Sequence, residues 1–495
     1  MKIAVVLFIK DEVEEIYSWI SWYKLIGVDT IIVADDNSND GTFEALSDIS
    51  NSFDIRVTKL PPSETPHSWR QKEVYISAIN NFKDEFEWIG FLDCDEYLLL
   101  EKHQNLKDFL EEFSPTVGQI CFNWCNYGSS DNITKPAWPS TFSYRNHLSK
   151  EEPINKHTKS FIRPKYWSGE WQTVHSFKME NDIETVNSSG KNFTWSDTVG
   201  IMENEPDWTN GKVMHFQCRS MENFVERFKK RTDINPSTHL WLEYNKGHEY
   251  DAKGSENVLK LRETMGDFFE NTIERVANEI GIFGKQYKHI SIEKFESDIF
   301  QSINILPHVN LFKIKTFHGK YCSTDAHGLT VAHDGDLQKI YGIKFLDKNK
   351  IFIFSENLNR FSILHDRRLC RFFSYDIFPT GKENQFFLRH PITKHFLTSE
   401  PVHIGGTIIS DRKQTGDWEK FQIEKINVTD EILKERLQNI SMFVCNFPNR
   451  LITTSNVEIT KKDLSCATEI IFNLLDENGK DLVRTKLKDS SSYII

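Results

Sequence analysis

The chain has 495 residues and a net charge of −12, from 60 basic and 72 acidic side chains. A chain of this length exceeds one ordinary hydrophobic core, so two or three domains are expected. The acidic balance argues against a nucleic-acid partner, because nucleic-acid binding rests largely on neutralised phosphates.

The N-terminus and the cysteines bear on the cellular compartment. Residues 1–9 form an apolar run that meets charge at Lys10 and lacks a small-residue cleavage site, so we expect a first strand rather than a signal peptide. No stretch approaches the ~20 apolar residues that span a bilayer. Eight cysteines are too few for a disulfide scaffold, and Cys121 and Cys125 have no second pair that would complete a zinc site. We therefore expect a cytoplasmic protein with reduced thiols and no transmembrane segment; peripheral membrane contact and the oligomeric state stay open.

Strands and helices alternate over the first hundred residues. Continuous apolar runs predict strands, and apolar residues at helical spacing predict helices, with Gly27 as the cap that ends the first helix. The expected strands are residues 3–9, 30–34, 55–57 and 88–92, and the expected helices are residues 13–26, a segment from Thr42, and 69–82. This rhythm predicts a parallel sheet with helices on both faces, whose ligands bind beyond the carboxyl ends of the strands.

Two acidic clusters follow two of these strands. Asp35 and Asp36 end the strand at residues 30–34, and Asp93-Cys94-Asp95-Glu96 follows the strand at residues 88–92. Paired carboxylates at the rim of a sheet suit a hard divalent cation. Taken alone, the second cluster also fits an acidic surface turn, and the first fits capping of the next helix, a task for which Asp40 is better placed. Both clusters are expected to meet in one crevice.

A repeat appears in the last third of the chain. Copies at Leu311–Thr324, Lys350–Ile363 and Gln385–Thr398 each predict strand, turn and strand, with a basic residue at Lys320, Arg360 and Lys394. Three such units resemble the fascin and ricin-type β-trefoils. A fourth copy at Met442–Thr454 does not fit a closed three-fold unit. We predict a domain at 1–235, a helical extension or linker at 236–305, and a β-trefoil-like domain with an additional C-terminal β segment at 306–495.

The first 235 residues resemble glycosyltransferases of the α/β GT-A fold, in particular families 2 and 92. The resemblance rests on both acidic clusters and on further motifs in the same order. These are Asn123-Trp124, Tyr127-Gly-Ser-Ser130, Lys159-Ser-Phe-Ile-Arg-Pro164, Val174-His175, Met214-His-Phe216 and Arg219-Ser-Met-Glu-Asn-Phe224.

The resemblance implies roles for individual residues, beside what their chemistry allows. Asp35 and Asp36 would accept hydrogen bonds from a uracil imide and ribose hydroxyls. Asp93 and Asp95 would serve a Mn²⁺ or Mg²⁺ ion, with Asp93 facing the ribose or a metal-bound water. His215 is expected as one further metal ligand, with a core histidine as the alternative. Lys10, Arg163 and Arg219 would contact the diphosphate or lie as surface charges.

The catalytic base has three candidates. Inverting transfer requires a base near the acceptor hydroxyl. We expect Glu170, which lies between Trp167 and Trp171, with Asp131 and His175 as rivals.

The sequence thus predicts a metal-dependent, inverting hexosyltransferase that uses a UDP-sugar and a glycan or glycoconjugate acceptor, with galactose as the sugar that the family favours. Two alternatives come from other classes. A sugar nucleotidyltransferase normally has a glycine-rich loop after the first strand, and Phe8–Glu12 contains no glycine. A non-catalytic carbohydrate-binding protein would be expected to lose the acidic residues, which are intact here.

Overall fold

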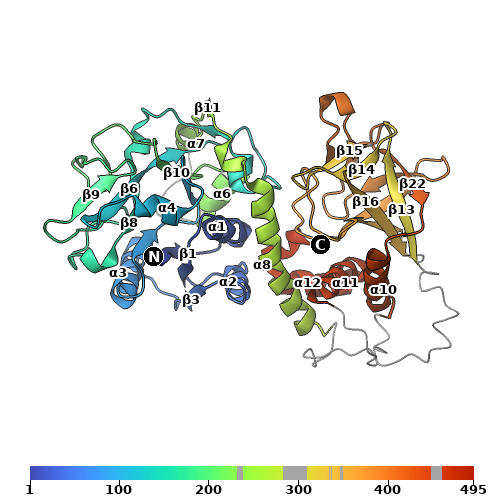
Figure 1. Ribbon diagram of the computed structural model, residues 1–495, viewed down its shortest axis with the longest axis horizontal. Helices are drawn as coiled ribbons and strands as arrows, with labels where there is room; N and C mark the ends of the chain where they lie inside the picture. The colour runs from blue at the N-terminus through green and yellow to red at the C-terminus, as the bar shows by residue number, and fades with distance from the viewer. Residues whose placement is uncertain (231–237, 282–308, 334, 336, 346–348, 447–459) are drawn as a thin grey trace. The chain divides into compact units, whose positions relative to one another are not determined.

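The computed structural model describes residues 1–495 except 231–237, 282–308, 334, 336, 346–348 and 447–459. The chain divides into two compact units, Met1–Phe268 and Phe269–Ile495 (Figure 1). Among the described residues, no helix has both the length and the apolar character needed to cross a bilayer. The seven cysteines described are all free thiols.

The first unit is built on a mixed nine-stranded sheet. Its order is β3-β2-β1-β4-β8-β6-β10-β5, with β9 beside β6. The pairs among β3, β2, β1 and β4 are parallel, whereas β8 is antiparallel to both of its neighbours. The strands are β1 (Ile3–Ile9), β2 (Thr30–Asp35), β3 (Ile55–Lys59), β4 (Trp88–Phe91), β5 (Glu96–Leu100), β6 (Val117–Asn126), β8 (Thr158–Ile162), β9 (Glu184–Asn187) and β10 (Gly211–His215). The short strands β7 (Asn146–His147) and β11 (Glu249–Tyr250) pair separately.

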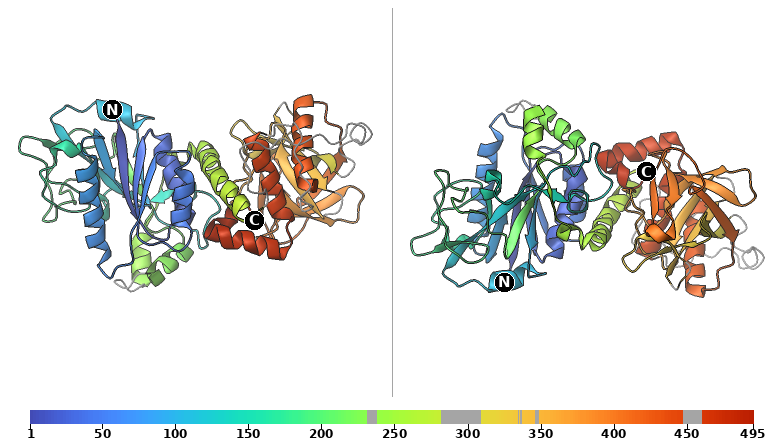
Figure 2. Two further views of the ribbon diagram at one scale, coloured as in Figure 1. Left: turned by 90° about the horizontal axis from the view of Figure 1, so that it is seen from below. Right: turned by 90° about the horizontal axis from the view of Figure 1, so that it is seen from above.

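Helices lie on both faces of this sheet (Figure 2). One face packs against α3 through a core of alternate β1 side chains, Ala4, Val6 and Phe8, and Tyr75 and Ile79 of the helix. Alternation along the strand sends the other β1 side chains to the opposite face. The helices are α1 (Val13–Leu25), α2 (Thr42–Ile49), α3 (His67–Phe82), α4 (Leu106–Glu111), α5 (Ser140–Ser143), α6 (Met221–Lys230), α7 (Thr238–Tyr244) and α8 (Val258–Glu279).

The elements predicted for the first hundred residues are confirmed to within a few residues. Gly27 follows α1 with a φ of +95°, a conformation that favours glycine, as expected of the residue that ends a helix.

The second unit contains a closed barrel of antiparallel strands. β13, β16, β17, β18, β19 and β22 pair in a ring, because β22 bonds both β19 and β13. Bridges Leu329–Ser362 and Leu364–Ile409 connect the segments outside this ring. The strands are β13 (Val309–Thr316), β14 (Tyr321–Thr324), β15 (Thr330–His333), β16 (Gln338–Phe345), β17 (Lys350–Ser355), β18 (Phe373–Pro379), β19 (Gln385–Arg389), β20 (Phe396–Ser399), β21 (Ile408–Arg412) and β22 (Lys420–Lys425).

The predicted C-terminal β segment is wrong where the structure describes it. Residues after the barrel form α10 (Glu431–Asn446), α11 (Lys461–Leu474) and α12 (Glu477–Leu487). The fourth repeat copy therefore begins inside α10, and its residues 447–454 lie outside the described residues. Residues 236–237 and 282–305 of the predicted linker at 236–305 also lie outside them. The apolar residues Leu433, Leu437 and Ile440 of α10 are buried at a spacing of three to four, which is helical rather than alternating.

Candidate active site

Both acidic clusters leave the sheet at the same edge. Asp35 ends β2 opposite Ile9 of β1, and β4 runs parallel to β1 on its other side before it leads into Asp93. Consecutive residues of α3 join the two clusters: Arg70 ion-pairs with Asp36, and Gln71 Nε2 donates to Asp93 Oδ1 at 2.9 Å. Carboxylates that are far apart in the sequence therefore meet beside the first turns of α3.

The first cluster is not needed to start the next helix. Asp40 accepts from the backbone N–H of Thr42, the first residue of α2, at 2.9 Å. Asp35 is fully buried; its Oδ1 accepts from Ser38 N at 3.0 Å, and its Oδ2 has no hydrogen-bond partner in the described structure. A buried carboxylate oxygen without a partner is costly, so this atom is suited to accept from a ligand donor.

The first aspartate of the second cluster is held by a buried lysine. Lys159 at the start of β8 is inaccessible to solvent, and its Nζ lies 2.7 Å from Asp93 Oδ2 and 3.1 Å from Glu96 Oε2. Burial raises the pKa of Asp93, but Lys159 outweighs it and the pKa is lowered. Burial raises the pKa of Glu96 to about 8. Both oxygens of Asp93 thus accept a hydrogen bond from within the protein, Oδ1 from Gln71 and Oδ2 from Lys159.

The second aspartate faces His215 and an arginine. His215 Nε2 lies 3.7 Å from Asp95 Oδ2, and Arg227 Nη1 lies 3.3 Å from the same oxygen. Burial raises the pKa of Asp95, but His215, Arg227 and Arg219 outweigh it, so the group is ionised. No cluster of three or more His, Cys, Asp or Glu side chains arranged for a metal occurs in the described part of the chain. Asp95 and His215 fit a divalent ion as two protein ligands, a set that a bound diphosphate would have to complete.

Three histidines surround Trp124, a residue of β6. Its indole Nε1 donates to Glu96 Oε1 at 2.8 Å, and its ring lies 4.2 Å from His215, 4.7 Å from His157 and 5.4 Å from His175, centroid to centroid. The fold thus brings His175 into the same group of residues as the acidic motif.

The basic candidates divide between the two edges of the sheet. Lys10 is exposed directly after β1 and forms no ion pair with any described residue, and Arg219 pairs with Glu12 at 2.9 Å beside Asp95. Arg163 ends β8, which is antiparallel to β4, so it pairs with Glu87 at the start of β4. Its predicted contact with the diphosphate is wrong, because it lies at the opposite edge from Asp93.

Two candidate bases lie outside the acidic group. Glu170 has a side chain that is 65% exposed and ion-paired with Lys178, and no described contact joins it to Asp93 or Asp95. Asp131 is exposed at a turn with a φ of +62°. Of the three candidates, only His175 is grouped with the acidic motif.

Sequence reasoning missed the residues that link the motifs. Arg70 and Gln71 on α3 were not singled out, and Lys159 was recognised only as part of a motif. Their partners are 22 to 66 positions away in the sequence. The one signal that the sequence offers is the presence of polar side chains at helix and strand positions that face the core.

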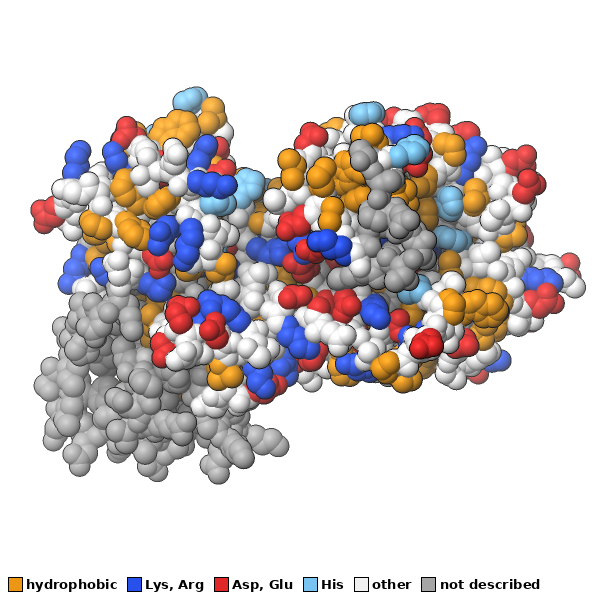
Figure 3. Space-filling view, turned by 180° about the vertical axis from the view of Figure 1, so that it is seen from behind, with side chains coloured by type: hydrophobic (Ala, Val, Ile, Leu, Met, Phe, Trp, Pro, Cys, Tyr) orange, Lys and Arg blue, Asp and Glu red, His pale blue; other side chains and the backbone are white. Residues whose placement is uncertain are grey.

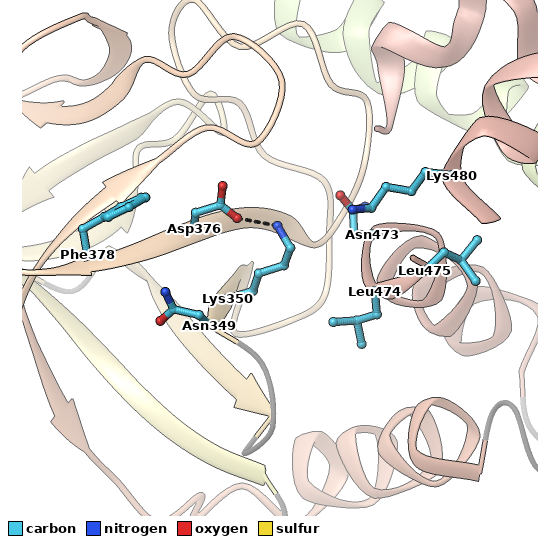
Figure 4. A pocket seen from close by; sticks show the side chains of 8 residues that line it. All are labelled: Asn349, Lys350, Asp376, Phe378, Asn473, Leu474, Leu475 and Lys480. Carbon is cyan, nitrogen blue, oxygen red and sulfur yellow. Dashed lines mark hydrogen bonds and ion pairs between the residues drawn. The ribbon is translucent and has the colours of Figure 1, made fainter. Parts of the chain in front are cut away.

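A separate hollow of about 300 Å³ lies within the second unit (Figure 4). Lys350 and Asp376, which are directly opposed on β17 and β18, form an ion pair on its barrel side, and Asn473 and Lys480 lie on its helical side. None of the site residues predicted from the sequence lines it.

A mixed sheet that has helices on both faces, and acidic residues at the carboxyl ends of its parallel strands, fits the GT-A class of glycosyltransferase folds. Residues 3–247, just under half of the chain, match the family model described as Glycosyltransferase family 92.

The similarity to individual proteins is confined to parts of the chain. A glycosyltransferase family 92 protein of Oryza sativa subsp. japonica is 27% identical over 187 residues, which are 37% of this chain and 31% of that protein. One of Arabidopsis thaliana is 25% identical over 180 residues, 33% of this chain and 29% of that protein. The chain thus spans about a third of the length of the curated relatives it matches.

Among solved structures, S. aureus TarS 1-349 in complex with UDP-GlcNAc matches at a TM-score of 0.28 and 12% identity, covering 55% of this chain and 73% of TarS. This score is too low to transfer a function.

Proposed function

We propose that the chain is a metal-dependent, inverting glycosyltransferase that moves a hexose from a UDP-sugar to a hydroxyl of a glycan or glycoconjugate. Galactose is the sugar that the family resemblance favours. The observation that carries the proposal is the link through α3, where Arg70 and Gln71 hold Asp36 and Asp93 at one sheet edge. A nucleotide bound at one cluster would place its diphosphate at the other.

Each end of the nucleotide has residues suited to it. The partnerless Oδ2 of Asp35 would accept from the uracil imide, and Asp36 from the ribose. Lys10, Arg219 and Arg227 would attract the diphosphate.

Asp95 and His215 would hold the metal, and an imidazole ligand favours Mn²⁺ over Mg²⁺. The bound ion would offset the charge that builds on the leaving diphosphate. Asp93, fixed by Gln71 and Lys159, would act beside the metal rather than on it.

The alternatives have less support. A sugar nucleotidyltransferase needs a phosphate-holding loop, but the segment after β1, Lys10-Asp11-Glu12, contains no glycine. A non-catalytic carbohydrate-binding protein would need no ionised Asp95 beside a histidine.

For the second unit, the closed six-stranded barrel and the threefold repeat support a β-trefoil that captures the acceptor glycan. No nucleic-acid partner is proposed: on the face in Figure 3, basic side chains are interspersed with acidic ones rather than gathered in a continuous stripe.

The test is substitution at the proposed metal ligand. Asp95→Ala should lower UDP release from the UDP-sugar about 10²- to 10³-fold, because the carboxylate that anchors the metal is gone. Removal of metal with EDTA should do the same to the parent. Asp84→Ala changes an exposed aspartate before β4 and is the matched control. Unchanged turnover in Asp95→Ala, or in the chelated parent, would refute the metal site.

A further inference from the structure

His175 is fixed in one tautomer by its neighbours. Its Nδ1 lies 2.7 Å from the backbone oxygen of Thr158. Because a carbonyl oxygen only accepts, the imidazole donates from Nδ1, and Nε2 carries the free lone pair. Nε2 bonds to no described residue and is not among the buried polar atoms, and the residue is partly exposed. The free nitrogen is therefore open to a ligand.

Gly200 shapes the space that His175 occupies. The backbone oxygen of Gly200 accepts from Thr158 N at 3.0 Å, so the residue that orients the imidazole is itself held by Gly200. Gly200 has a φ of +101°, and a Cβ placed on it would lie 2.7 Å from the Cβ of His175. Any larger residue would be strained there and would displace His175.

The rest of the backbone around His175 is equally constrained. Thr173 Oγ1 accepts from the His175 N–H at 3.0 Å, and Ser160 Oγ donates to the His175 carbonyl at 2.7 Å. Three hydrogen bonds, one at the imidazole and two at the backbone, therefore fix His175, which meets the demand for precise placement that catalytic groups have.

Burial and the Lys159 ammonium keep His175 neutral. Burial lowers its pKa to about 3, with a further lowering by the Lys159 ammonium, and Asp93 acts in the opposite direction. His157, which faces it across 5.9 Å, is also neutral near pH 7, because burial lowers its pKa. The neutral imidazole carries a free lone pair on Nε2, but a pKa this low opposes the uptake of a proton. The negative charge of a bound sugar diphosphate has to raise this pKa before Nε2 can act as a base.

We infer that His175 is the catalytic residue that accepts the proton of the acceptor hydroxyl, and that Gly200 is its positioning residue. This inference rests on the proposed function. As the hydroxyl oxygen bonds to C1 of the sugar, Nε2 takes its proton. The bond from C1 to the diphosphate breaks, and its electron pair leaves with UDP. The imidazolium then returns the proton to solvent.

The first experiment separates donor binding from transfer. His175→Asn keeps an N–H for the Thr158 carbonyl and removes the free imidazole nitrogen. With Mn²⁺, water as acceptor and the UDP-sugar that the parent hydrolyses fastest, kcat should fall about 10²- to 10⁴-fold. The Kd of UDP should stay within twofold, and added imidazole should restore part of the rate of His175→Ala. A kcat within threefold of the parent, or a comparable loss in Glu170→Gln instead, would overturn the assignment.

The second experiment tests whether Gly200 acts through His175. Gly200→Ala should lower kcat roughly 10- to 100-fold in the parent, because a small misplacement of a catalytic group is costly. In the His175→Asn background it should cause no further loss. Gly190→Ala is the control: Gly190 also has a positive φ of +73°, but the nearest atom to a Cβ added there is 3.7 Å away. An equal loss from Gly200→Ala in both backgrounds would show a merely structural role.

The two proposals fail in different ways. If the parent neither binds UDP nor releases it from any UDP-sugar, the proposed function fails. If the parent does both and His175→Asn matches it, only the assignment of His175 fails.

Discussion

Lys159 changes the role that its neighbour Asp93 is able to play. The ammonium is buried and pairs with Asp93 and Glu96, so the first aspartate of the motif is neutralised from within the protein. Removing one partner of a buried pair leaves an uncompensated charge. Asp95, with His215 beside it, is then the carboxylate best placed to meet a metal.

Asp35 gives a prediction about the nucleobase. Asp35→Asn would turn one acceptor into an N–H donor facing the uracil imide, while the other oxygen still accepts from Ser38 N. UDP affinity should fall by about 1–3 kcal/mol, which is roughly 5- to 150-fold. CDP, whose ring nitrogen N3 is an acceptor, should bind the variant better than UDP does.

Isothermal titration of both nucleotides in Mn²⁺ checks this. The parent should prefer UDP. A variant that keeps the preference of the parent would place the base elsewhere.

The direction of one strand explains most of what the sequence missed at the site. Lys159 and Arg163 stand four positions apart in one motif, and the sequence does not show that β8 runs antiparallel to β4. Because it does, Lys159 meets Asp93 and Arg163 meets Glu87 at the other edge. The parallel strands β1, β2 and β4 were predictable, since each alternates with a helix and ends in polar residues.

In the C-terminal region, the apolar pattern of the sequence does not distinguish a helix from a strand. A short run such as Met442–Thr454 has apolar residues that suit a strand or a helix equally well. In the part that the structure describes, Met442–Asn446 continues α10, in which Leu437 and Ile440 are buried at helical spacing.

The second unit contains an ion pair, Asp366–Arg368, that is almost inaccessible to solvent. Arg368 donates to both oxygens of Asp366 and to the backbone oxygen of Ser374, and both charged side chains are almost inaccessible. Arg368→Met leaves the buried carboxylate without its cation and should cost about 3–5 kcal/mol.

Hydrogen exchange of the backbone amides of β18 (Phe373–Pro379), measured by mass spectrometry in increasing urea, reports this cost within the second unit. The partly exposed Arg484, paired with Asp481, provides the control, and Arg484→Met should cost less than about 1 kcal/mol. Equal stability of the two variants would show that the Asp366–Arg368 pair does not stabilise the barrel.

At the scale of the whole chain, the acidic clusters and the barrel belong to two different units, each with its own hydrophobic core. The family match covers residues 3–247, and the barrel lies beyond it. The family match therefore does not bear on our proposal that the barrel captures the acceptor glycan. The cytoplasmic location stays a prediction from the sequence.

The central claim is that both acidic clusters bind one sugar nucleotide with a divalent ion. Calorimetric titration of UDP into the full chain, with and without Mn²⁺, tests it most directly in the parent, Asp35→Asn and Asp95→Ala. UDP should bind the parent in a Mn²⁺-dependent way, and both substitutions should weaken this binding at least fivefold, one at the base and one at the diphosphate. Binding that is the same in all three proteins, or no binding to the parent, would contradict it.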